Sequence, residues 1–231
     1  MACSLAETRV EGAIYRIARK PNPWEWPDWQ YVGDDGNRWD DPRKVYRVLY
    51  AGTSILGCFL EVLARFRPNP KLIEAFEGIE ENDTDLPETE RPGTLPQEWL
   101  NERRLAEVLG TEGIFAAVGQ AESLSCLNLE LADLCRAHGF EELDGAAIRQ
   151  KAPRALTQAI STHVHQTVAR DGKQFAGIYY LSRWGDDISN FALFEGDDRW
   201  QVREVRFPEL GDHVDEFHKA LEMHGIELRS A

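Results

Sequence analysis

Three β-rich runs lie close together near the end of the chain, with only short turns between them. They span 176–182, 191–195 and 200–207, and Gly-Asp-Asp occurs in each intervening turn. Gly and Asp favour tight turns, and strands joined by short turns pair antiparallel. The segment 210–223 then has a helical apolar pattern, and Gly225 is a good C-terminal stop before a final short strand. The chain therefore needs an antiparallel sheet with a helix beside it.

A further strand pattern lies near the start of the chain. Residues Gly12–Ala18 alternate in the manner of a half-buried strand, and the Pro- and Trp-rich run 21–29 cannot continue it. The tryptophans of that run, Trp24, Trp26 and Trp29, either line a ligand cleft or hold the loop against the core. Loop tryptophans more often do the second, so we expect a loop pinned to the sheet.

A strand followed directly by a helix comes next, and such a junction is a common place for a ligand site. Residues Val45–Ala51 are β-branched and aromatic and end at Gly52. Thr53 is well placed as the N-cap of a helix whose apolar face runs to about Arg67, where Pro68 stops it.

The middle of the chain predicts short strands at 105–109 and 114–118 and helices at 127–138 and 152–170. The run 77–96 is acidic, rich in Pro and Thr and without a period. We expect it to be a surface excursion, which is also a candidate partner surface, and not a linker between domains.

Composition limits the classes of protein to consider. At 231 residues one sizeable core suffices, so we expect a single domain, with a core of about 12–207 and a C-terminal helix and strand over 208–231. The chain has 26 Lys and Arg and 40 Asp and Glu, which gives a net charge of −14, and the sequence contains no local basic patch. Direct binding of nucleic acid is not expected.

The cysteines and the apolar segments bear on the compartment. Cys3, Cys58, Cys126 and Cys135 lack CxxC spacing, so reduced thiols are expected in place of a zinc site or a disulfide framework. The first residues lack the apolar core of a signal peptide, and no stretch is apolar for long enough to span a bilayer. We expect a cytoplasmic protein without a membrane partner.

Three polar residues stand apart from the predicted core pattern. Arg38 lies in a Gly- and Asn-containing loop, Glu61 interrupts an apolar helix face, and Ser182 ends a strand. An arginine fork suits a diphosphate, and a carboxylate among apolar neighbours needs a polar partner. The alternatives are a solvated or salt-bridged Glu61 and an Arg38 paired with a nearby aspartate. Those aspartates are Asp34, Asp35, Asp40 and Asp41.

Other recognised chemistries find little support. Ser182 has no GxSxG context, so a hydrogen-bonding serine is expected there and not a nucleophile. His163 and His165 lie roughly 200° apart around a helix axis and are poor joint metal ligands, so we expect no metal. Neither GxGxxG after a strand nor GxxxxGK[ST] is present, and a nucleotide would have to bind in another way.

Six short motifs together resemble the RES domain, a family named for an arginine, a glutamate and a serine. The likeness spans roughly Gly12 to Phe207, and the three residues would here be Arg38, Glu61 and Ser182. Asn37 and Asp40 stand where the family usually has Gly and Asn, and Asp40 adds a negative charge beside Arg38. The motifs are Tyr15-Arg16, Asn37-Arg38-Trp39-Asp40, Val48-Leu49-Tyr50-Ala51, Phe59-Leu60-Glu61-Val62, Gly177-Ile178-Tyr179-Tyr180-Leu181-Ser182 and Asn190-Phe191-Ala192-Leu193-Phe194.

The resemblance implies an ADP-ribosyltransferase-like α+β fold, with mostly antiparallel sheets and flanking helices, and NAD as substrate. It implies that Arg38 holds the diphosphate or a ribose, that Tyr50 orients the nicotinamide end, and that Ser182 and Asn190 contact the substrate. Glu61 would stabilise the positive charge that develops on the ribose when nicotinamide leaves.

The resemblance also implies a partner, because toxins of this family are neutralised by an Xre-type helix-turn-helix antitoxin. Our leading hypothesis is an NAD glycohydrolase that acts as the toxin of such a pair. A protein ADP-ribosyltransferase of the same fold, and a non-catalytic domain that binds a nucleotide or a partner, are the alternatives. A homo-oligomer stays open.

Overall fold

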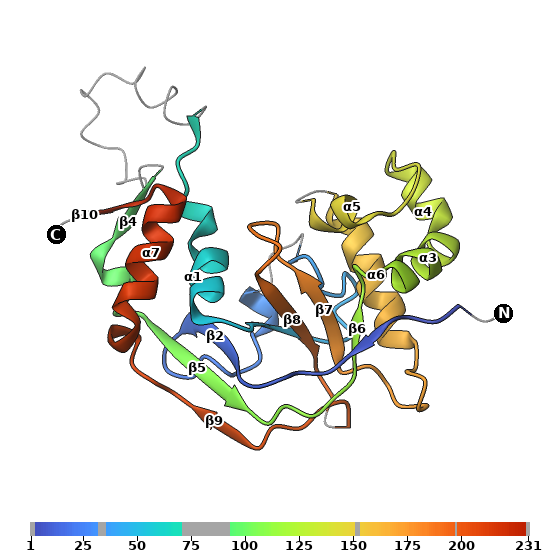
Figure 1. Cartoon of the computed structure of the whole chain (residues 1–231), viewed down its shortest axis with the longest axis horizontal. Coiled ribbons are helices and arrows are strands. Elements are labelled where there is room, and N and C mark those ends of the chain that lie inside the picture. Colours follow the sequence, from blue (N-terminus) through green and yellow to red (C-terminus); the bar gives the residue numbers. More distant parts are fainter. Residues whose placement is uncertain (1–2, 32–35, 71–92, 151–152, 197, 230–231) are drawn as a thin grey trace.

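The computed structural model describes residues 3–31, 36–70, 93–150, 153–196 and 198–229. Within these residues eight strands form one curled sheet, in the order β1-β6-β7-β8-β3-β2-β5-β9 (Figure 1). Every pair in it is antiparallel except β6 with β7. The strands are β1 (Glu7–Thr8), β2 (Ile14–Arg19), β3 (Val48–Gly52), β5 (Arg103–Leu109), β6 (Phe115–Ala117), β7 (Gly177–Leu181), β8 (Ser189–Phe194) and β9 (Glu204–Arg206).

The helices flank this sheet in two groups (Figure 1). One group packs Phe59 of α1 against Phe217 of α7, with ring centroids 5.5 Å apart. The other group covers the opposite end of the sheet, next to the N-terminus. The expected α+β architecture, a mostly antiparallel sheet with flanking helices, is confirmed. The helices are α1 (Ile55–Leu63), α3 (Ala121–Glu130), α4 (Ala132–Ala137), α5 (Gly145–Arg149), α6 (Arg154–Gln166) and α7 (Val214–His224).

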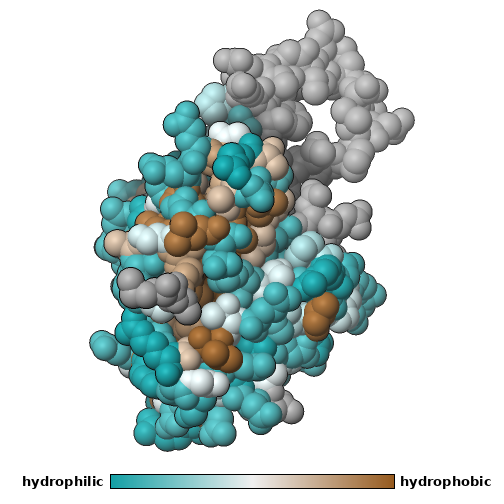
Figure 2. Space-filling model, turned by 90° about the vertical axis from the view of Figure 1, so that its right-hand side faces the viewer, coloured by the Kyte–Doolittle hydropathy of each residue, from teal (hydrophilic) through white to brown (hydrophobic). Residues whose placement is uncertain are grey.

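Figure 2 shows the end of the molecule that carries the second helical group. This face is mainly hydrophilic, and its apolar residues form separate small groups. Leu129 of α3 is 76% exposed. Isolated exposed apolar side chains are normal on a protein surface. None of the helices among the described residues has both the length and the apolar character needed to cross a bilayer.

The strand-to-helix junction is present, but two of its predicted boundaries were wrong. Ser54, and not Thr53, is the N-cap of α1, and its hydroxyl accepts a hydrogen bond from the Gly57 amide at 3.1 Å. The amide of Thr53 instead donates to the Ser189 carbonyl at 3.0 Å, which extends the sheet by one residue. β3 begins three residues later than expected because Lys44 turns the chain with φ of 56°.

The last third of the chain is confirmed in part. β7 and β8 pair antiparallel, and Gly225 ends α7 in the left-handed conformation with φ of 64°. β9 is shorter than predicted. It does not pair with β8, the strand before it in sequence, but with β5 at the far edge of the sheet. The final strand β10 (Glu227–Arg229) pairs parallel with β4 (Thr94–Pro96) in a separate two-stranded sheet.

The predicted middle elements are present with different ends. The helix expected at 127–138 is two helices, α3 and α4, because Leu131 leaves helical geometry with φ of −114° and ψ of 18°. The helix expected at 152–170 is α6, and both predicted strands are observed as β5 and β6. Of the acidic run 77–96, residues 77–92 lie outside the described residues, and β4 follows them.

Two of the three loop tryptophans hold the loop against the sheet, as predicted. Trp24 and Trp26 each pack edge-on against Trp200, with ring centroids 6.1 Å and 6.0 Å apart. This contact holds the loop against the sheet beside β9. Trp29 instead lines a small cavity of about 90 Å³ behind Tyr50.

The expectation of four reduced thiols was wrong for one pair. Cys3 and Cys126 form a disulfide, with Cα atoms 5.1 Å apart, that joins the N-terminal segment to α3. Their 123-residue separation in sequence hides this proximity, which depends on the pairing of β1 with β6 and on the bond from the Ala6 amide to Ser123 of α3. Cys58 and Cys135 are free and buried.

The close approach of β7 to β8 depends on a glycine. A Cβ atom on Gly177 would lie 2.0 Å from the carbonyl oxygen of Ala192, so a side chain there forces the strands apart. We expect Gly177→Ala to lower the free energy of unfolding by about 2 kcal/mol or more, measured by urea denaturation. Gly145→Ala is the matched control, because a Cβ there meets nothing within 4 Å. Equal losses in both variants would contradict this explanation.

A histidine packed between α6 and the sheet makes stability depend on pH. His165 stacks on Tyr46 with ring centroids 3.9 Å apart, and Arg199 donates to its Nε2 at 2.9 Å. Burial, followed by the positive charge of Arg199, lowers the pKa of His165 to about 4. Protonation is therefore harder in the folded state than in the unfolded state.

Between about pH 6.5 and pH 4 the unfolded state binds more protons at this group, so stability falls as the pH falls through this window. We expect His165→Gln, which keeps an acceptor for Arg199, to reduce the loss of stability between pH 7 and pH 4 by about 1–3 kcal/mol. Urea denaturation across this range is the measurement. Identical pH profiles for the variant and the wild type would contradict the assignment.

Candidate active site

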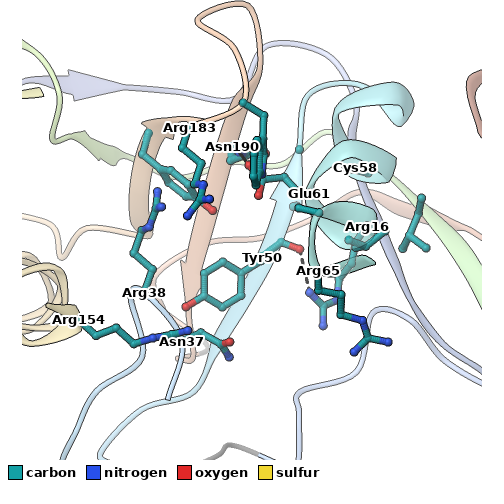
Figure 3. A pocket seen from close by; sticks show the side chains of 17 residues that line it. Arg16, Asn37, Arg38, Tyr50, Cys58, Glu61, Arg65, Arg154, Arg183 and Asn190 are labelled. Carbon is teal, nitrogen blue, oxygen red and sulfur yellow. Dashed lines mark hydrogen bonds between the residues drawn. The ribbon is translucent and has the colours of Figure 1, made fainter. Parts of the chain in front are cut away.

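A cavity of about 640 Å³ opens between α1 and the loop that carries Arg38. This volume is within the range of sites that bury a ligand of cofactor size. Side chains from several strands, from α1 and from the Arg38 loop converge on it (Figure 3). They include Arg16 of β2, Arg38, Tyr50 of β3, Glu61 of α1, Tyr180 of β7 and Asn190 of β8.

The loop that presents Arg38 is held by Asp40, a buried carboxylate at 6% exposure. Asp40 accepts hydrogen bonds from the Asn37 amide at 2.7 Å, the Asn37 side chain at 2.9 Å and the Tyr50 hydroxyl at 2.8 Å. The Trp39 amide donates to the same hydroxyl at 3.0 Å. The two positions that depart from the family pattern, Asn37 and Asp40, therefore bond each other. The charge of Asp40 is directed into the loop.

Tyr50 serves this loop through its hydroxyl and the pocket through its ring. Burial, and then the nearby charge of Asp40, raises the pKa of Tyr50 well above its usual value of 10.0, so the phenol keeps its proton. A protonated hydroxyl can donate to Asp40 while it accepts from Trp39. The side chain predicted to contact the substrate is therefore also part of the support of the Arg38 loop.

Arg38 has no acidic partner among the residues that the structure describes. Its guanidinium donates to the carbonyl of Arg149 at 3.2 Å and lies 5.9 Å from the ring centre of Tyr180. Of the aspartates considered as partners, Asp40 bonds within the loop and Asp41 pairs with Arg43. Asp34 and Asp35 lie outside the described residues.

Glu61 enters the pocket from α1 and has a polar partner on the sheet. Its Oε1 accepts a hydrogen bond from Asn190 Nδ2 at 3.0 Å. Asn190 is 3% exposed, so the amide is fixed by its surroundings and orients the carboxylate. The structure thus brings Arg38, Tyr50, Glu61 and Asn190 to one pocket.

Ser182 is the predicted site residue that does not line this pocket. Its side chain is buried, at 1% exposure, and its hydroxyl accepts a hydrogen bond from the Trp184 amide at 3.0 Å. Its amide donates to the Ile188 carbonyl at 2.8 Å and so closes the turn after β7. The residues that line the pocket from this turn are Arg183 and Trp184, and Ser182 holds the backbone amide of Trp184.

Gly52 and Cys58 belong to the site although the sequence did not single them out. A Cβ on Gly52 would lie 3.0 Å from Cys58 Sγ and 3.2 Å from Asn190 Oδ1. Only glycine lets β3 approach both side chains this closely. Burial raises the pKa of Cys58 to about 12, and its thiol donates to the Tyr15 carbonyl at 3.1 Å. Cys58 is therefore a neutral wall residue.

The pocket is basic although the chain is acidic. Five arginines line it, together with the single carboxylate of Glu61 (Figure 3). Arg16 is anchored by bonds to the carbonyls of Pro23 and Tyr50 at 2.8 Å and 2.9 Å, and burial lowers its pKa. The arginines are Arg16, Arg38, Arg65, Arg154 and Arg183. Clustered guanidinium groups favour a ligand with phosphates.

No group of three or more His, Cys, Asp or Glu side chains that could hold a metal ion is found in the described part of the chain.

Comparison with known proteins agrees with the residues of the pocket. Residues 13–104 match the model of the RES domain, so the resemblance is confirmed for the part of the chain that holds Arg38, Tyr50 and Glu61. No curated protein matches the sequence. Among solved structures, a chain of the M. tuberculosis MbcT–MbcA toxin–antitoxin complex is similar, at 12% identity and a TM-score of 0.47, over 89% of this chain and 88% of that chain.

The hydrogen bonds around Tyr50 give a direct test of the site's construction. Tyr50→Phe leaves the Asp40 carboxylate and the Trp39 amide each without one partner. We expect this variant to lose about 1–3 kcal/mol of stability in urea denaturation, the cost of unsatisfied buried polar groups. Asp40→Asn should lose at least as much, because an amide that keeps its oxygen for the Tyr50 hydroxyl turns its NH₂ group toward the two Asn37 donors. A Tyr50→Phe variant as stable as the wild type would show that these bonds do not hold the loop.

Proposed function

We propose that this chain is an enzyme that cleaves the bond between nicotinamide and ribose in NAD. The observation that carries the proposal is that Arg38 and Glu61 line one pocket of about 640 Å³ and both lie in the segment that matches the RES domain. The family resemblance implies NAD as the substrate. The pocket volume and its arginines agree with a dinucleotide whose diphosphate needs cationic partners.

The arginines of the pocket bind the diphosphate of NAD in this proposal. Arg38 has no carboxylate partner among the described residues, and the loop that carries it is held by Asp40. Arg154 reaches the same loop, since its guanidinium donates to the Gly36 carbonyl at 2.6 Å. We assign the diphosphate to Arg38, with Arg154 beside it, because charge-assisted bonds from a preformed fork are strong and directional.

The chemical step needs a negative charge close to the ribose. The nicotinamide of NAD is cationic, so it leaves as a neutral molecule and the positive charge passes to the ribosyl carbon. A fixed carboxylate stabilises that charge as it develops. We assign this role to Glu61. Asn190 holds Oε1, which leaves Oε2 for the ribose, and Asn190 is therefore a positioning residue.

Tyr50 and Ser182 take narrower roles in this proposal. The Tyr50 ring borders the pocket, where it can pack against the nicotinamide end while its hydroxyl bonds Asp40. Ser182 acts on the substrate only through the Arg183–Trp184 turn that it supports.

Water is our choice as the group that attacks the ribosyl carbon, which gives nicotinamide and ADP-ribose. An acceptor side chain on another protein would instead make the chain an ADP-ribosyltransferase. Incubation with NAD labelled in the adenosine, with and without cell lysate, distinguishes the two reactions. Label that stays in free ADP-ribose supports hydrolysis, and label on protein supports transfer.

The biological role follows from the same resemblance. We propose that the chain is the toxin of a toxin–antitoxin pair, acts in the cytoplasm on cellular NAD, and is neutralised by an Xre-type helix-turn-helix antitoxin. Expression of the chain alone should lower cellular NAD and stop growth, and co-expression of the antitoxin should restore both.

Glu61→Gln tests the chemical assignment. The amide keeps the size and a hydrogen-bonding oxygen but removes the charge, so the rate of nicotinamide release should fall about 100-fold or more, the usual cost of one preorganised electrostatic contact. Steady-state release of nicotinamide from NAD is the measurement, with circular dichroism as the check on folding.

The matched control is Glu222→Gln, the same substitution at an exposed position on α7. It should release nicotinamide at the wild-type rate. A Glu61→Gln variant with full activity would overturn the role of Glu61.

A further inference from the structure

Two arginines lie against one tryptophan at the edge of the pocket. The Cζ of Arg183 is 4.3 Å from the centre of the Trp184 ring, and the Cζ of Arg67 is 4.5 Å from it. Both distances are those of cation–π contacts, which orient the guanidinium groups. Arg67 follows α1, whereas Arg183 and Trp184 belong to the turn after β7. The tryptophan therefore joins two distant segments of the chain around two positive charges.

A third positive charge is close to these two. Burial lowers the pKa of Arg183, and the positive charges of Arg38 and Arg67 lower it further, while Glu61 opposes them. Figure 3 shows the Arg38 and Arg183 side chains on one side of the pocket, with their guanidinium groups pointing toward one another. Like charges at close range repel, so this arrangement is more favourable with an anion between them than without one.

No carboxylate of the described part of the protein pairs directly with any of these arginines, and Glu61 acts on Arg183 without an ion pair. Arg38, Arg67 and Arg183 form no ion pair there, although the chain has 40 acidic residues for 26 basic ones. Another arginine nearby does have a carboxylate partner: Arg149 of α5 pairs with Asp186 of the turn after β7. Arg67 and Arg183 are thus left for a ligand.

A diphosphate alone does not use all of this charge. NAD carries two phosphate charges, for which Arg38 and Arg154 suffice. Arg16 is already bonded to two carbonyls. Arg65 lies over the Phe66 ring, and Arg67 and Arg183 remain on the Trp184 side, where each contacts the Trp184 ring. A further phosphate on the ligand would satisfy both.

We infer that the site prefers a dinucleotide with a third phosphate on the adenosine ribose, NADP over NAD, and that Arg67 and Arg183 bind that phosphate beside Trp184. This inference rests on the proposed function for the choice of a dinucleotide. The reaction is unchanged: the bond between nicotinamide and ribose breaks, water supplies the hydroxyl group, and the product is 2′-phospho-ADP-ribose.

The first experiment compares the two dinucleotides as substrates. The wild type should have a kcat/KM for NADP at least about tenfold above that for NAD, the worth of one to two charge-assisted hydrogen bonds. Arg183→Ala and Arg67→Ala should each lower the ratio of the two kcat/KM values about tenfold. Arg136→Ala, which removes an exposed arginine paired with Asp133 on α4, is the matched control and should keep the wild-type ratio.

The second experiment measures binding without turnover. Titration calorimetry at constant ionic strength should give tighter binding of adenosine 2′,5′-bisphosphate than of AMP by at least about tenfold, and Arg183→Ala should abolish the difference. AMP together with inorganic phosphate should not reproduce the tight binding, because the third phosphate has to be attached to the ribose.

The two proposals can fail separately. Release of nicotinamide from NAD with an equal or lower kcat/KM for NADP would overturn this inference and leave the proposed function standing. Preference for the bisphosphate that depends on Arg183, without release from either dinucleotide, would support the phosphate site and overturn the proposed function. Equal binding of AMP and the bisphosphate would overturn the inference whatever the activity.

Discussion

The buried carboxylate of Asp40 is the interaction on which the candidate site depends. It accepts two hydrogen bonds from Asn37 and one from Tyr50, and thereby ties the loop before Arg38 to the central strand β3. A buried carboxylate is costly unless its oxygens are bonded, and here three donors bond it. Because the donors come from the loop and from the sheet, the loop cannot move away without leaving that charge unsatisfied. Arg38 is therefore presented at a fixed place.

On the opposite wall of the pocket, a buried polar side chain likewise holds a charged one in place. Asn190 of β8 is buried and bonds Glu61 of α1, while Gly52 lets β3 approach Asn190 and Cys58. Arg38 and Glu61 are thus fixed from the two sides of one short segment of sheet. Preorganised charges of this kind act on a reacting substrate without rearrangement, which is where most electrostatic catalysis comes from.

Local sequence patterns predicted the strands and helix ends that depend on residues close together in the chain. Alternation located β2, β-rich runs located β7 and β8, and Gly225 predicted the end of α7. Thr53 and Ser54 are equally good caps by residue type, and the pairing of Thr53 with β8 decided between them. The sequence shows no such pairing, so the predicted cap was wrong by one residue.

Contacts between distant segments explain the remaining differences. Arg38 and Glu61 were singled out by their neighbours in sequence and by the family resemblance. The inward direction of Asp40 depends on Tyr50, ten residues away on another element. The cluster of Arg67 and Arg183 depends on Trp184 and on the packing of α1 beside the turn after β7. No pattern in a single segment predicts contacts of this kind.

The most direct measurement of the central claim is a proton NMR time course of NAD with the purified protein. The account predicts that nicotinamide and ADP-ribose signals grow at equal rates as those of NAD disappear, and that this stops when Glu61 loses its charge. Unchanged NAD in the presence of folded protein would contradict it.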